Sequence, residues 1–564
     1  MQPDQFESKK NMGFIIGASS VGTLIEWYDF YIFGMLATII SKQFFPPDSG
    51  SSALLSTLAI FAAGFLVRPF GALVFGRLGD LIGRKYTFLL TLILMGGSTF
   101  AIGLVPGFAS IGWAAPLIVL ALRLLQGLAL GGEYGGAATY VAEHAHANRR
   151  GFWTSWIQTT ATLGLFLSLG IIILIRNAQG VDKFSAEWGG WRYPFWISAL
   201  LVIISIIIRM RMNESPLFAK LKAEKKTSTN PIKESFGHKA NFKMVLLALF
   251  GATMGQGVVW YTGQFYAQSF IENVCKVNFI DSRNVLLVAI LFATPFFVIF
   301  ASLSDKIGRK WVMLAGMLLG ILSYRPIFQS FRNMTDPKNR TELLDVSKTV
   351  VSASASVDAK NKKKMLVTTS YDSMYTDGAK YTYRKIDTVS LEADYAGNTA
   401  SVGMIVAGKD SSQQADTVVS KVKAAAGVTL ADGVTYVQAA IRSGKTAIAE
   451  KELDRGTFWK IVGLIFLLII FVTLVYGPIA AFLVELFPTK IRYTSMSLPY
   501  HVGNGIFGGL VPFLGTLIVE MTKSPANPNG DPLAGLWYPI GVAAVCFVIG
   551  AIYLKDHVVE DVLN

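Results

Sequence analysis

Long apolar segments recur along almost the whole chain, and they constrain its fold more than any other feature. A membrane-spanning helix needs about 20 predominantly apolar residues. Apolar residues make up 52% of the 564 residues and charged residues only 16%, which is too little polar surface for a water-soluble protein of this size. The sequence therefore predicts an all-α polytopic membrane protein with twelve transmembrane helices. The expected spans are residues 12–40, 53–75, 86–105, 116–140, 153–175, 193–210, 244–270, 285–303, 311–331, 457–484, 494–521 and 536–554.

The distribution of basic residues indicates how these helices are oriented. The chain has 51 Lys and Arg against 37 Asp and Glu, and short connections after the even-numbered spans hold many of them. Cytoplasmic loops carry an excess of Lys and Arg, so we expect those connections and both termini to be cytoplasmic. The pattern is an orientation signal rather than a nucleic-acid surface. The first apolar run is too long for a cleavable signal peptide, and the expected location is the cytoplasmic (inner) membrane.

A sequence repeat divides the chain into two halves. The string GRLGDLIGRK at residues 76–85 recurs as ASLSDKIGRK at residues 301–310, an offset of 301 − 76 = 225. Matching Glu485 to Glu143 gives a larger offset of 342, and the difference, 342 − 225 = 117, measures an insertion in the second half. Six plus six helices in the same orientation predict two parallel bundles related by an axis along the membrane normal.

The insertion lies between the ninth and tenth expected helices and is polar. Strand-like alternation at residues 381–395 and 400–406, with a turn at Asp432 and Gly433, predicts a small α+β domain outside the cytoplasm. It would act as a lid or as a platform for a protein partner. The predicted organisation is an N-terminal bundle (1–212), a cytoplasmic linker (213–243), helices seven to nine (244–332), the inserted domain (333–456), and helices ten to twelve with the tail (457–564).

Two carboxylates in the first expected helix are the strongest functional signal. An ionisable side chain inside a span costs at least about 2.5–3.5 kcal/mol on insertion scales, so it needs a function or a partner. Glu26 and Asp29 lie three residues apart and share one helix face. Two such groups in a medium of low dielectric repel one another, and the pair can take up and release a proton. The alternative is that both are fixed partners of an arginine or of backbone donors.

The fourth expected helix carries polar residues beside a stripe of glycines. Arg123 can bind a substrate carboxylate with two hydrogen bonds or influence a neighbouring acid; the alternative is a static ion pair with Glu26 or Asp29. Gln126 is assigned to the substrate site and Glu133 to the proton site. A stripe of small residues lets a neighbouring helix approach closely, and its members here are Gly127, Gly131 and Gly135.

Two other spans supply polar and aromatic residues for a cavity. An aromatic stripe either lines a cavity or belongs to helix packing, and a lone histidine is either hydrogen-bonded structure or a proton relay. For Arg68 and Arg325, each followed by proline, the favoured interpretation is a position near a helix end, from which the charge reaches the interface. The expected lining residues are Tyr261, Gln264 and Tyr266 of the seventh span and Tyr500, His501 and Asn504 of the eleventh.

The repeated loop motif predicts a latch on the cytoplasmic side. Asp80 can accept a hydrogen bond from the N-terminus of a following helix or pair with Arg84, and Asp305 and Arg309 hold the equivalent positions in the second copy. Breaking and remaking such contacts would let one half rock against the other. The same gate is expected to include the charged residues after the fourth and tenth helices, Glu143, Glu485 and Arg492.

With these motifs the sequence resembles the major facilitator superfamily and, within it, the metabolite:proton symporters, a group that includes proline/betaine, α-ketoglutarate, citrate and shikimate permeases. The strings that carry the resemblance are EWYDF (26–30), FLVRPFGALVFGRLGDLIGRK (65–85), RLLQGLALGGEYGGA (123–137), ESP (214–216) and ELFPTKIRYTSMSLPYHVGNGIFGG (485–509). The resemblance implies alternating access, with substrate and proton sharing a central cavity and the proton gradient, rather than a cofactor, as energy source. The 117-residue insertion departs from the pattern of the group.

By the same resemblance Glu26 and Asp29 would be proton sites, Arg123 a coupling or anion-binding residue, and the repeated loop motif the cytoplasmic gate. The expected function is secondary active transport, namely proton-coupled uptake of a small carboxylate-bearing metabolite, either a di- or tricarboxylate or a zwitterion such as proline or betaine. The alternative is a non-transporting sensor or assembly protein that uses the insertion. No enzyme and no metal site are expected, because the sequence shows no catalytic triad, metal-spaced histidine cluster or nucleophile motif.

Overall fold

The computed structural model of the chain describes residues 9–46, 50–210, 222–224, 228–344, 349–358, 361–390, 403–406, 447–527 and 529–555. The chain forms two compact units. Unit 1 comprises Met1–Tyr266, Leu287–Pro326 and Ile465–Asn564, and unit 2 comprises Ala267–Leu286 and Ile327–Leu464.

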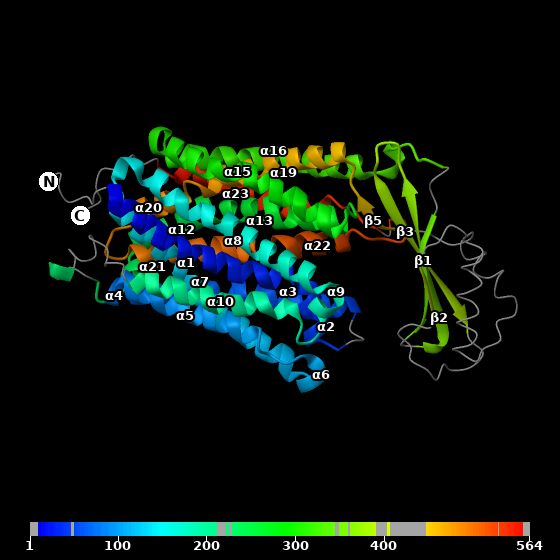
Figure 1. Ribbon diagram of the computed structural model, residues 1–564. Coiled ribbons are helices and arrows are strands. Elements are labelled where there is room, and N and C mark those ends of the chain that lie inside the picture. Colours follow the sequence, from blue (N-terminus) through cyan, green and yellow to red (C-terminus); the bar gives the residue numbers. More distant parts are fainter. Residues whose placement is uncertain are drawn as a thin grey trace. The chain divides into compact units, whose positions relative to one another are not determined.

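The first half of unit 1 is a bundle of long apolar helices that run roughly side by side (Figure 1). A bend of 62° separates α1 from α2, and the short helices α6 (Phe108–Ile111) and α9 (Val181–Ser185) lie in connections. The long helices are α1 (Lys9–Met35), α2 (Ala37–Phe44), α3 (Gly50–Leu66), α4 (Arg68–Ile82), α5 (Arg84–Ile102), α7 (Ala114–His144), α8 (Arg150–Gln179) and α10 (Tyr193–Met210).

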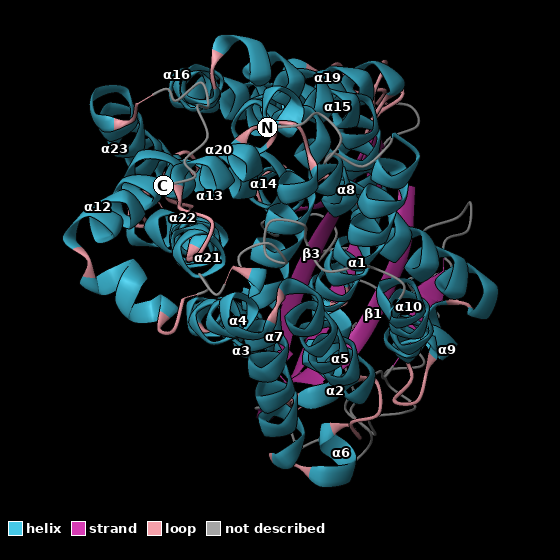
Figure 2. Ribbon diagram, turned by 90° about the vertical axis from the view of Figure 1, so that its left-hand side faces the viewer, coloured by secondary structure: helices cyan, strands magenta, loops and turns pink. Residues whose placement is uncertain are grey.

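The second half of the chain is also helical, and α14 with the adjoining ends of α15, α16 and α19 belongs to unit 2. In Figure 2, which looks along the helices, α21 lies beside α4 of the first half. Three π-helical turns interrupt the second half: η6 (Leu249–Thr253), η7 (Thr262–Tyr266) and η9 (Val502–Gly508). The helices are α12 (Lys239–Ala248), α13 (Met254–Tyr261), α14 (Ala267–Asn273), α15 (Phe279–Ile307), α16 (Arg309–Thr335), α19 (Arg455–Tyr476), α20 (Ile479–Leu486), α21 (Arg492–His501), α22 (Val511–Met521) and α23 (Trp537–Tyr553).

The helices confirm a polytopic membrane protein. Within the described residues ten helices are long and apolar enough to cross a membrane, and the bent pair α1–α2 makes up to eleven. The third expected span coincides with a shorter apolar helix, Leu89–Ile102. Each expected span therefore overlaps a helix, and the count of twelve crossings stays a prediction.

The glycine stripe of α7 packs as expected for small residues at a helix interface. A Cβ added at Gly127 would lie 2.1 Å from the Gly64 carbonyl oxygen, and one at Gly131 would lie 2.3 Å from the Arg68 carbonyl oxygen. Contacts this close leave no room for a side chain, so the stripe lets the backbone of α7 touch the backbone of α3 and α4.

We expect Gly131→Ala to destabilise the protein by about 1–3 kcal/mol, because the added methyl group forces α7 away from α4. Gly97→Ala is the matched control, because a Cβ at Gly97 in α5 meets nothing within 4 Å. Thermal unfolding of both purified variants in detergent is the measurement. Equal unfolding midpoints for the two variants would contradict the close approach of the helices.

Unit 2 contains an antiparallel five-stranded sheet in the order β4-β1-β2-β3-β5. Its strands are β1 (Thr349–Asp358), β2 (Asn361–Met374), β3 (Lys380–Ser390), β4 (Gly403–Val406) and β5 (Ala447–Glu452). Strands were expected at residues 381–395 and 400–406, where β3 and β4 lie, whereas the expected turn at Asp432 and Gly433 falls outside the described residues.

The sheet of unit 2 is fastened to the C-terminal end of α16 by buried cations. Lys451 of β5 donates a hydrogen bond of 2.5 Å to the Thr335 carbonyl oxygen, where the partial negative charge of a helix end favours a cation. Arg340 pairs with Asp454 at 2.9 Å and also pairs with Asp377. These contacts fix both ends of the sheet-forming segment, since α16 ends at Thr335 and α19 begins at Arg455.

Candidate functional site

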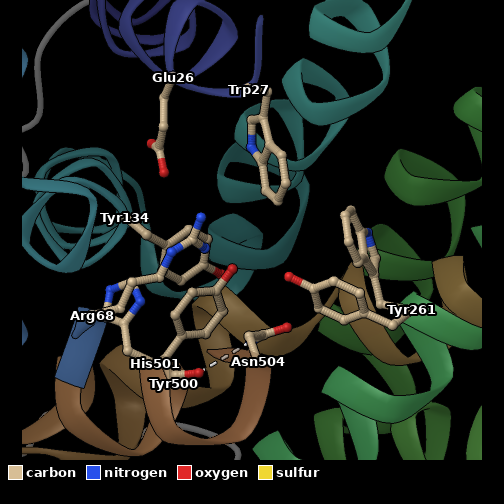
Figure 3. Close-up of a pocket in the computed structure, with 9 residues that line it drawn as sticks. Glu26, Trp27, Arg68, Tyr134, Tyr261, Tyr500, His501 and Asn504 are labelled. Atoms are coloured by element: carbon tan, nitrogen blue, oxygen red, sulfur yellow. Dashed lines mark hydrogen bonds between the residues drawn. The ribbon is translucent and has the colours of Figure 1, made fainter. Parts of the chain in front are cut away.

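A pocket inside unit 1 draws its lining from both halves of the bundle (Figure 3). Five of the lining residues, Glu26, Tyr261, Tyr500, His501 and Asn504, were expected from the sequence. The other four are Trp27, Arg68, Tyr134 and Trp260. The structure therefore brings a carboxylate of the first helix, a guanidinium of α4 and the polar face of α21 and η9 into one space.

Irregular helix geometry positions several of these side chains. The span that contains Arg68 runs from Ala59 to Ile82 and is broken at Val67, with Pro69 in the first turn of α4. Arg68 therefore lies in the middle of the span and is 6% exposed. The interpretation that Arg68 reaches the interface from a helix end is wrong, because its side chain is buried and lines the pocket.

The π-helical turn η9 holds Asn504 at the pocket wall. A π-turn is common at functional sites, and the glycine at position 503 lets this one pack tightly against the backbone of Thr253. The amide of Asn504 exchanges two hydrogen bonds with the amide of Gln256, at 3.0 and 2.8 Å. Asn504 is thereby fixed in orientation before any ligand arrives.

Asp29 and Arg123 belong to a buried hydrogen-bonded chain next to the pocket, rather than to its lining. Arg123 donates to Gln126, Gln126 donates to the Thr99 hydroxyl at 2.8 Å, and Thr99 donates to the Asp29 carboxylate at 3.0 Å. Asp29 and Arg123 are 0% and 2% exposed. Arg123 forms no ion pair within the part of the chain that the structure describes, so the structure shows this hydrogen-bonded link to Asp29 in place of the alternative of a static ion pair.

A layer of tyrosines joins the two halves beside Glu26. The rings of Tyr134 and Tyr500 stack with centroids 3.6 Å apart. Gln158 donates to the Tyr134 hydroxyl at 2.7 Å, and the hydroxyls of Tyr476 and Tyr500 lie 2.9 Å apart.

These four residues are related by the internal repeat. The offset of 342 that links Glu143 to Glu485 also links Tyr134 to Tyr476 and Gln158 to Tyr500. Sequence reasoning missed Tyr134 and Tyr476, and applying this offset to the polar residues of the fourth span would have found them.

Aromatic contacts connect α1 and its neighbours to α13 and η7 on the other side of the pocket. The ring centroids of Trp27 and Trp260 lie 5.1 Å apart. Tyr31 stacks on Phe265 at 5.8 Å. Since each pair takes one ring from each half, these contacts join the two halves beside the pocket.

The remaining residues expected in the cavity lie elsewhere. Tyr266 packs its ring against Gly515 of α22, so the packing interpretation holds for Tyr266. Gln264 is buried in η7 and does not line the pocket. Glu133 lies in α7, and its side chain falls outside the described part of the structure.

Helix α1 begins at one end of unit 1 (Figure 1). At this end two aspartates of the repeated motif cap helices of the opposite half. Asp80 accepts hydrogen bonds from the Thr494 N–H at 2.9 Å and the Thr494 hydroxyl at 2.7 Å, at the start of α21. Asp305 accepts from the N–H groups of Gly151 and Phe152, at 2.9 and 2.8 Å, at the start of α8. A carboxylate is favoured at a helix N-terminus by the unpaired N–H groups and the helix dipole.

The structure adds a partner for Asp80 that the sequence did not predict. Asp80 caps α21 of the other half, while its contact with the helix that follows it in the chain stays a prediction. The physical reason is the close packing of Gly79 against the ring of Tyr493, where an added Cβ would lie 2.2 Å from the ring. The side chain of Arg84 is outside the described part, so its pairing with Asp80 stays a prediction.

Ion pairs form a second layer of the same latch. Arg309 pairs with Asp305 at 2.6 Å and with Glu485 at 3.0 Å, and Arg150 lies 3.8 Å from Glu485. On the other side of the latch, near Asp80 and α21, Arg492 pairs with Glu143 at 3.4 Å. The expected gate residues Asp305, Arg309, Glu143, Glu485 and Arg492 are thus brought together across the two halves.

The fold and the site define a class: a polytopic membrane protein whose two helical halves enclose a charged pocket and meet in a repeated latch. A structure search agrees with this class. The solved structure of the major facilitator superfamily proton:xylose symporter XylE bound to 6-bromo-6-deoxy-D-glucose matches with a TM-score of 0.62 at 13% identity, covering 98% of this chain and 97% of that chain. At this identity the match establishes the fold alone.

Sequence comparisons identify the family. The profile described as "Sugar (and other) transporter" matches residues 15–230. Alpha-ketoglutarate permease of Escherichia coli (strain K12) is 32% identical over 359 residues, which cover 64% of this chain and 81% of the permease. A proline/betaine transporter of Salmonella typhimurium is 34% identical over 312 residues, covering 54% of this chain and 61% of that transporter. The chain belongs to the major facilitator superfamily of membrane transporters, and these relatives are transporters rather than enzymes.

Proposed function

We propose that the protein is a secondary active transporter that takes up a small carboxylate-bearing metabolite together with protons. The observation that carries the proposal is the pocket that Glu26 shares with residues of both halves, together with latch contacts that run between the halves. A site lined by both halves fits alternating access, in which the two halves move against one another and expose the site to one side of the membrane at a time.

Glu26 and Asp29 are the proposed proton-binding groups, and they occupy different surroundings. Glu26 lines the pocket, so its charge acts on the substrate directly. Asp29 is linked through Thr99 and Gln126 to Arg123. Protonation of Asp29 removes the charge that this chain of hydrogen bonds stabilises, which favours the coupling role for Arg123 over direct substrate binding.

The latch end of unit 1 is proposed to face the cytoplasm. Basic residues flank the repeated motifs, and the excess of Lys and Arg in cytoplasmic loops supports this orientation. Both termini would then be cytoplasmic and the inserted sheet extracytoplasmic, in the inner membrane. The sheet would be attached to the end of α16 through Lys451 and to the start of α19 through Arg340.

The proposal is tested by transport measurements on the purified chain in lipid vesicles. Relatives are named as transporters of proline/betaine, alpha-ketoglutarate, shikimate and citrate, so radiolabelled proline, glycine betaine, α-ketoglutarate, shikimate and citrate form the panel. We expect at least one to accumulate when the pH outside the vesicles is lowered, and a proton ionophore to abolish the accumulation. Uptake of no panel member, or uptake that the ionophore leaves unchanged, would contradict the proposal.

A non-transporting sensor or assembly protein remains the second candidate, and the ordered sheet of unit 2 is the observation that favours it. An anchor has no need for a latch whose contacts run between the halves, so the capping of α21 and α8 by Asp80 and Asp305 favours transport. The candidates differ in one outcome: the sensor predicts an unchanged cellular phenotype when Asp80 and Arg84 are replaced and the insertion is kept.

A further inference from the structure

Arg68 is a buried cation that faces the pocket without a protein partner. It is 6% exposed and lines the pocket, and it forms no hydrogen bond or ion pair with any residue that the structure describes. Its guanidinium lies over the rings of Phe65, 4.4 Å from the centroid, and Phe30, at 5.2 Å. Ring faces stabilise a cation, but they leave its N–H donors without acceptors.

An unpaired charge inside a protein costs several kcal/mol, and this cost is recovered when an anion of good geometry arrives. We propose that Arg68 binds the carboxylate of the transported substrate. The proposal rests on the transport function argued above and assigns one subsite within it. A guanidinium is suited to this role because its planar array of donors matches the two oxygens of a carboxylate.

Arg123 provides the contrast within the same region. Arg123 already donates to Gln126, and its guanidinium is covered by the rings of Phe33 at 4.3 Å and Phe61 at 4.8 Å. It does not belong to the pocket lining. Of these two arginines, Arg68 is therefore the one that a substrate in the pocket can reach.

Trp260 supplies a second donor on the pocket wall. Its indole N–H is buried and has no hydrogen-bond partner among the described residues, and the side chain is 1% exposed. Both residues line the pocket. A buried donor without an acceptor costs free energy, so an oxygen-rich substrate that accepts from either residue would recover that cost.

Glu26 limits what the rest of the substrate can be. The same pocket holds the Glu26 carboxylate, so the part of the substrate near Glu26 either carries positive charge or faces Glu26 when it holds a proton. A zwitterion meets the first condition and a dicarboxylate meets the second. Both share the carboxylate that Arg68 would bind, and the experiment below separates them.

The test measures how strongly the pocket prefers a carboxylate over a neutral amide. Uptake into vesicles is competed with proline against prolinamide for zwitterions, and with α-ketoglutarate against 2-oxopentanediamide, in which both carboxylates are amides, for dicarboxylates. A charge-assisted hydrogen bond contributes about 1.5–3 kcal/mol, and every 1.4 kcal/mol is a factor of ten. Arg68→Gln is therefore expected to weaken binding of the carboxylate substrate by about 100-fold or more. It is also expected to abolish the preference for the carboxylate over the amide. The pair that shows the effect identifies the substrate class.

Three further variants keep the test decisive. Arg68→Lys retains the charge and is expected to restore part of the affinity, and Trp260→Phe removes one donor while keeping the ring, for a loss of about tenfold. Arg325→Gln is the matched control, because Arg325 is also followed by proline and lies over an aromatic ring, that of Trp537 at 4.8 Å, outside the pocket lining. It should leave the preference unchanged. Size-exclusion profiles and unfolding midpoints identify any variant that fails to fold.

The outcomes separate this inference from the transport function on which it rests. If the unmodified chain transports a carboxylate but Arg68→Gln keeps the preference for carboxylate over amide, the assignment of Arg68 is wrong and the transport function stands. Where Arg68→Gln does not fold, Arg68→Lys decides, and an affinity for the carboxylate equal to that of the unmodified chain overturns the assignment. If the unmodified chain transports neither the zwitterion nor the dicarboxylate, the transport function fails and the subsite fails with it.

Discussion

Asp29→Asn is expected to abolish accumulation of substrate against its gradient while leaving exchange of substrate across the membrane. A free energy of 1.4 kcal/mol corresponds to a factor of ten, so a pH difference of about two units can drive roughly 100-fold accumulation for each coupled proton. An asparagine neither binds nor releases a proton at this position, yet its side-chain oxygen can still accept the hydrogen bond from Thr99. The accumulation ratio should therefore fall to about 1.

Glu26→Gln is expected to give the same loss of accumulation and, in addition, a change in apparent substrate affinity. The reason for the difference is that Glu26 lines the pocket, whereas Asp29 lies behind it in the hydrogen-bonded chain. Accumulation driven by an imposed pH gradient, compared with exchange at equal pH on both sides, separates coupling from binding.

Glu520→Gln is the matched control for both variants. It also removes one carboxylate, but Glu520 is exposed and pairs with Lys523 on the surface of α22, so its accumulation ratio should match that of the unmodified protein. A pH-driven accumulation that survives in both Asp29→Asn and Glu26→Gln would show that the protons are bound elsewhere.

Asp80→Asn and Asp305→Asn are expected to open the latched end of unit 1. Each carboxylate accepts two hydrogen bonds at the start of a helix of the opposite half, and a hydrogen bond to a charged group contributes about 1.5–3 kcal/mol. Losing even one of these interactions shifts the equilibrium between closed and open forms by about 10- to 100-fold. Transport slows because the cycle must return through the latched form.

The opening can be measured by chemical labelling of Ser497→Cys. Ser497 is fully buried against Gly135 at the contact between α21 and α7, and the native Cys275 and Cys546 are both buried. The rate of reaction with a membrane-permeant maleimide should rise about 10- to 100-fold when Asp80→Asn is added.

Glu187→Gln is the control for the latch. Glu187 accepts hydrogen bonds from the Gly107 N–H and the Ser110 hydroxyl, so it makes similar contacts that stay within one half. When Glu187→Gln is added to Ser497→Cys, the labelling rate should equal that of Ser497→Cys alone. An unchanged rate in Asp80→Asn would mean that the capping contact does not hold this end closed.

The helical architecture and its repeat could be predicted because they depend on local composition. A stretch of about 20 apolar residues forms a helix in a membrane whatever its neighbours are, since the backbone must satisfy its own hydrogen bonds there. The repeated motif likewise marks Asp80 and Asp305 as equivalent positions, and the structure uses both in the same way. The strands β3 and β4 followed from the alternation of their residues.

The partners of the buried charges could not be predicted in the same way. Arg68 and Arg123 look alike in the sequence, as single arginines in apolar spans. Arg68 lines the pocket, whereas Arg123 donates to Gln126 and is covered by the rings of Phe33 and Phe61. Gln126 is a neighbour of Arg123 in the chain, but the sequence does not show which of the two arginines the other helices leave facing a cavity.

The sequence by itself determined a two-part helical membrane protein with acidic groups in its first span and a latch motif in each half. The tertiary structure alone decided that Asp80 caps α21, that Tyr134 stacks on Tyr500, and that Arg68 rather than Arg123 meets the pocket. The physical reason is range: helix formation and membrane insertion are set by neighbours along the chain, while the cap of Asp80 and the cavity that Arg68 faces are set by helices far away in the chain.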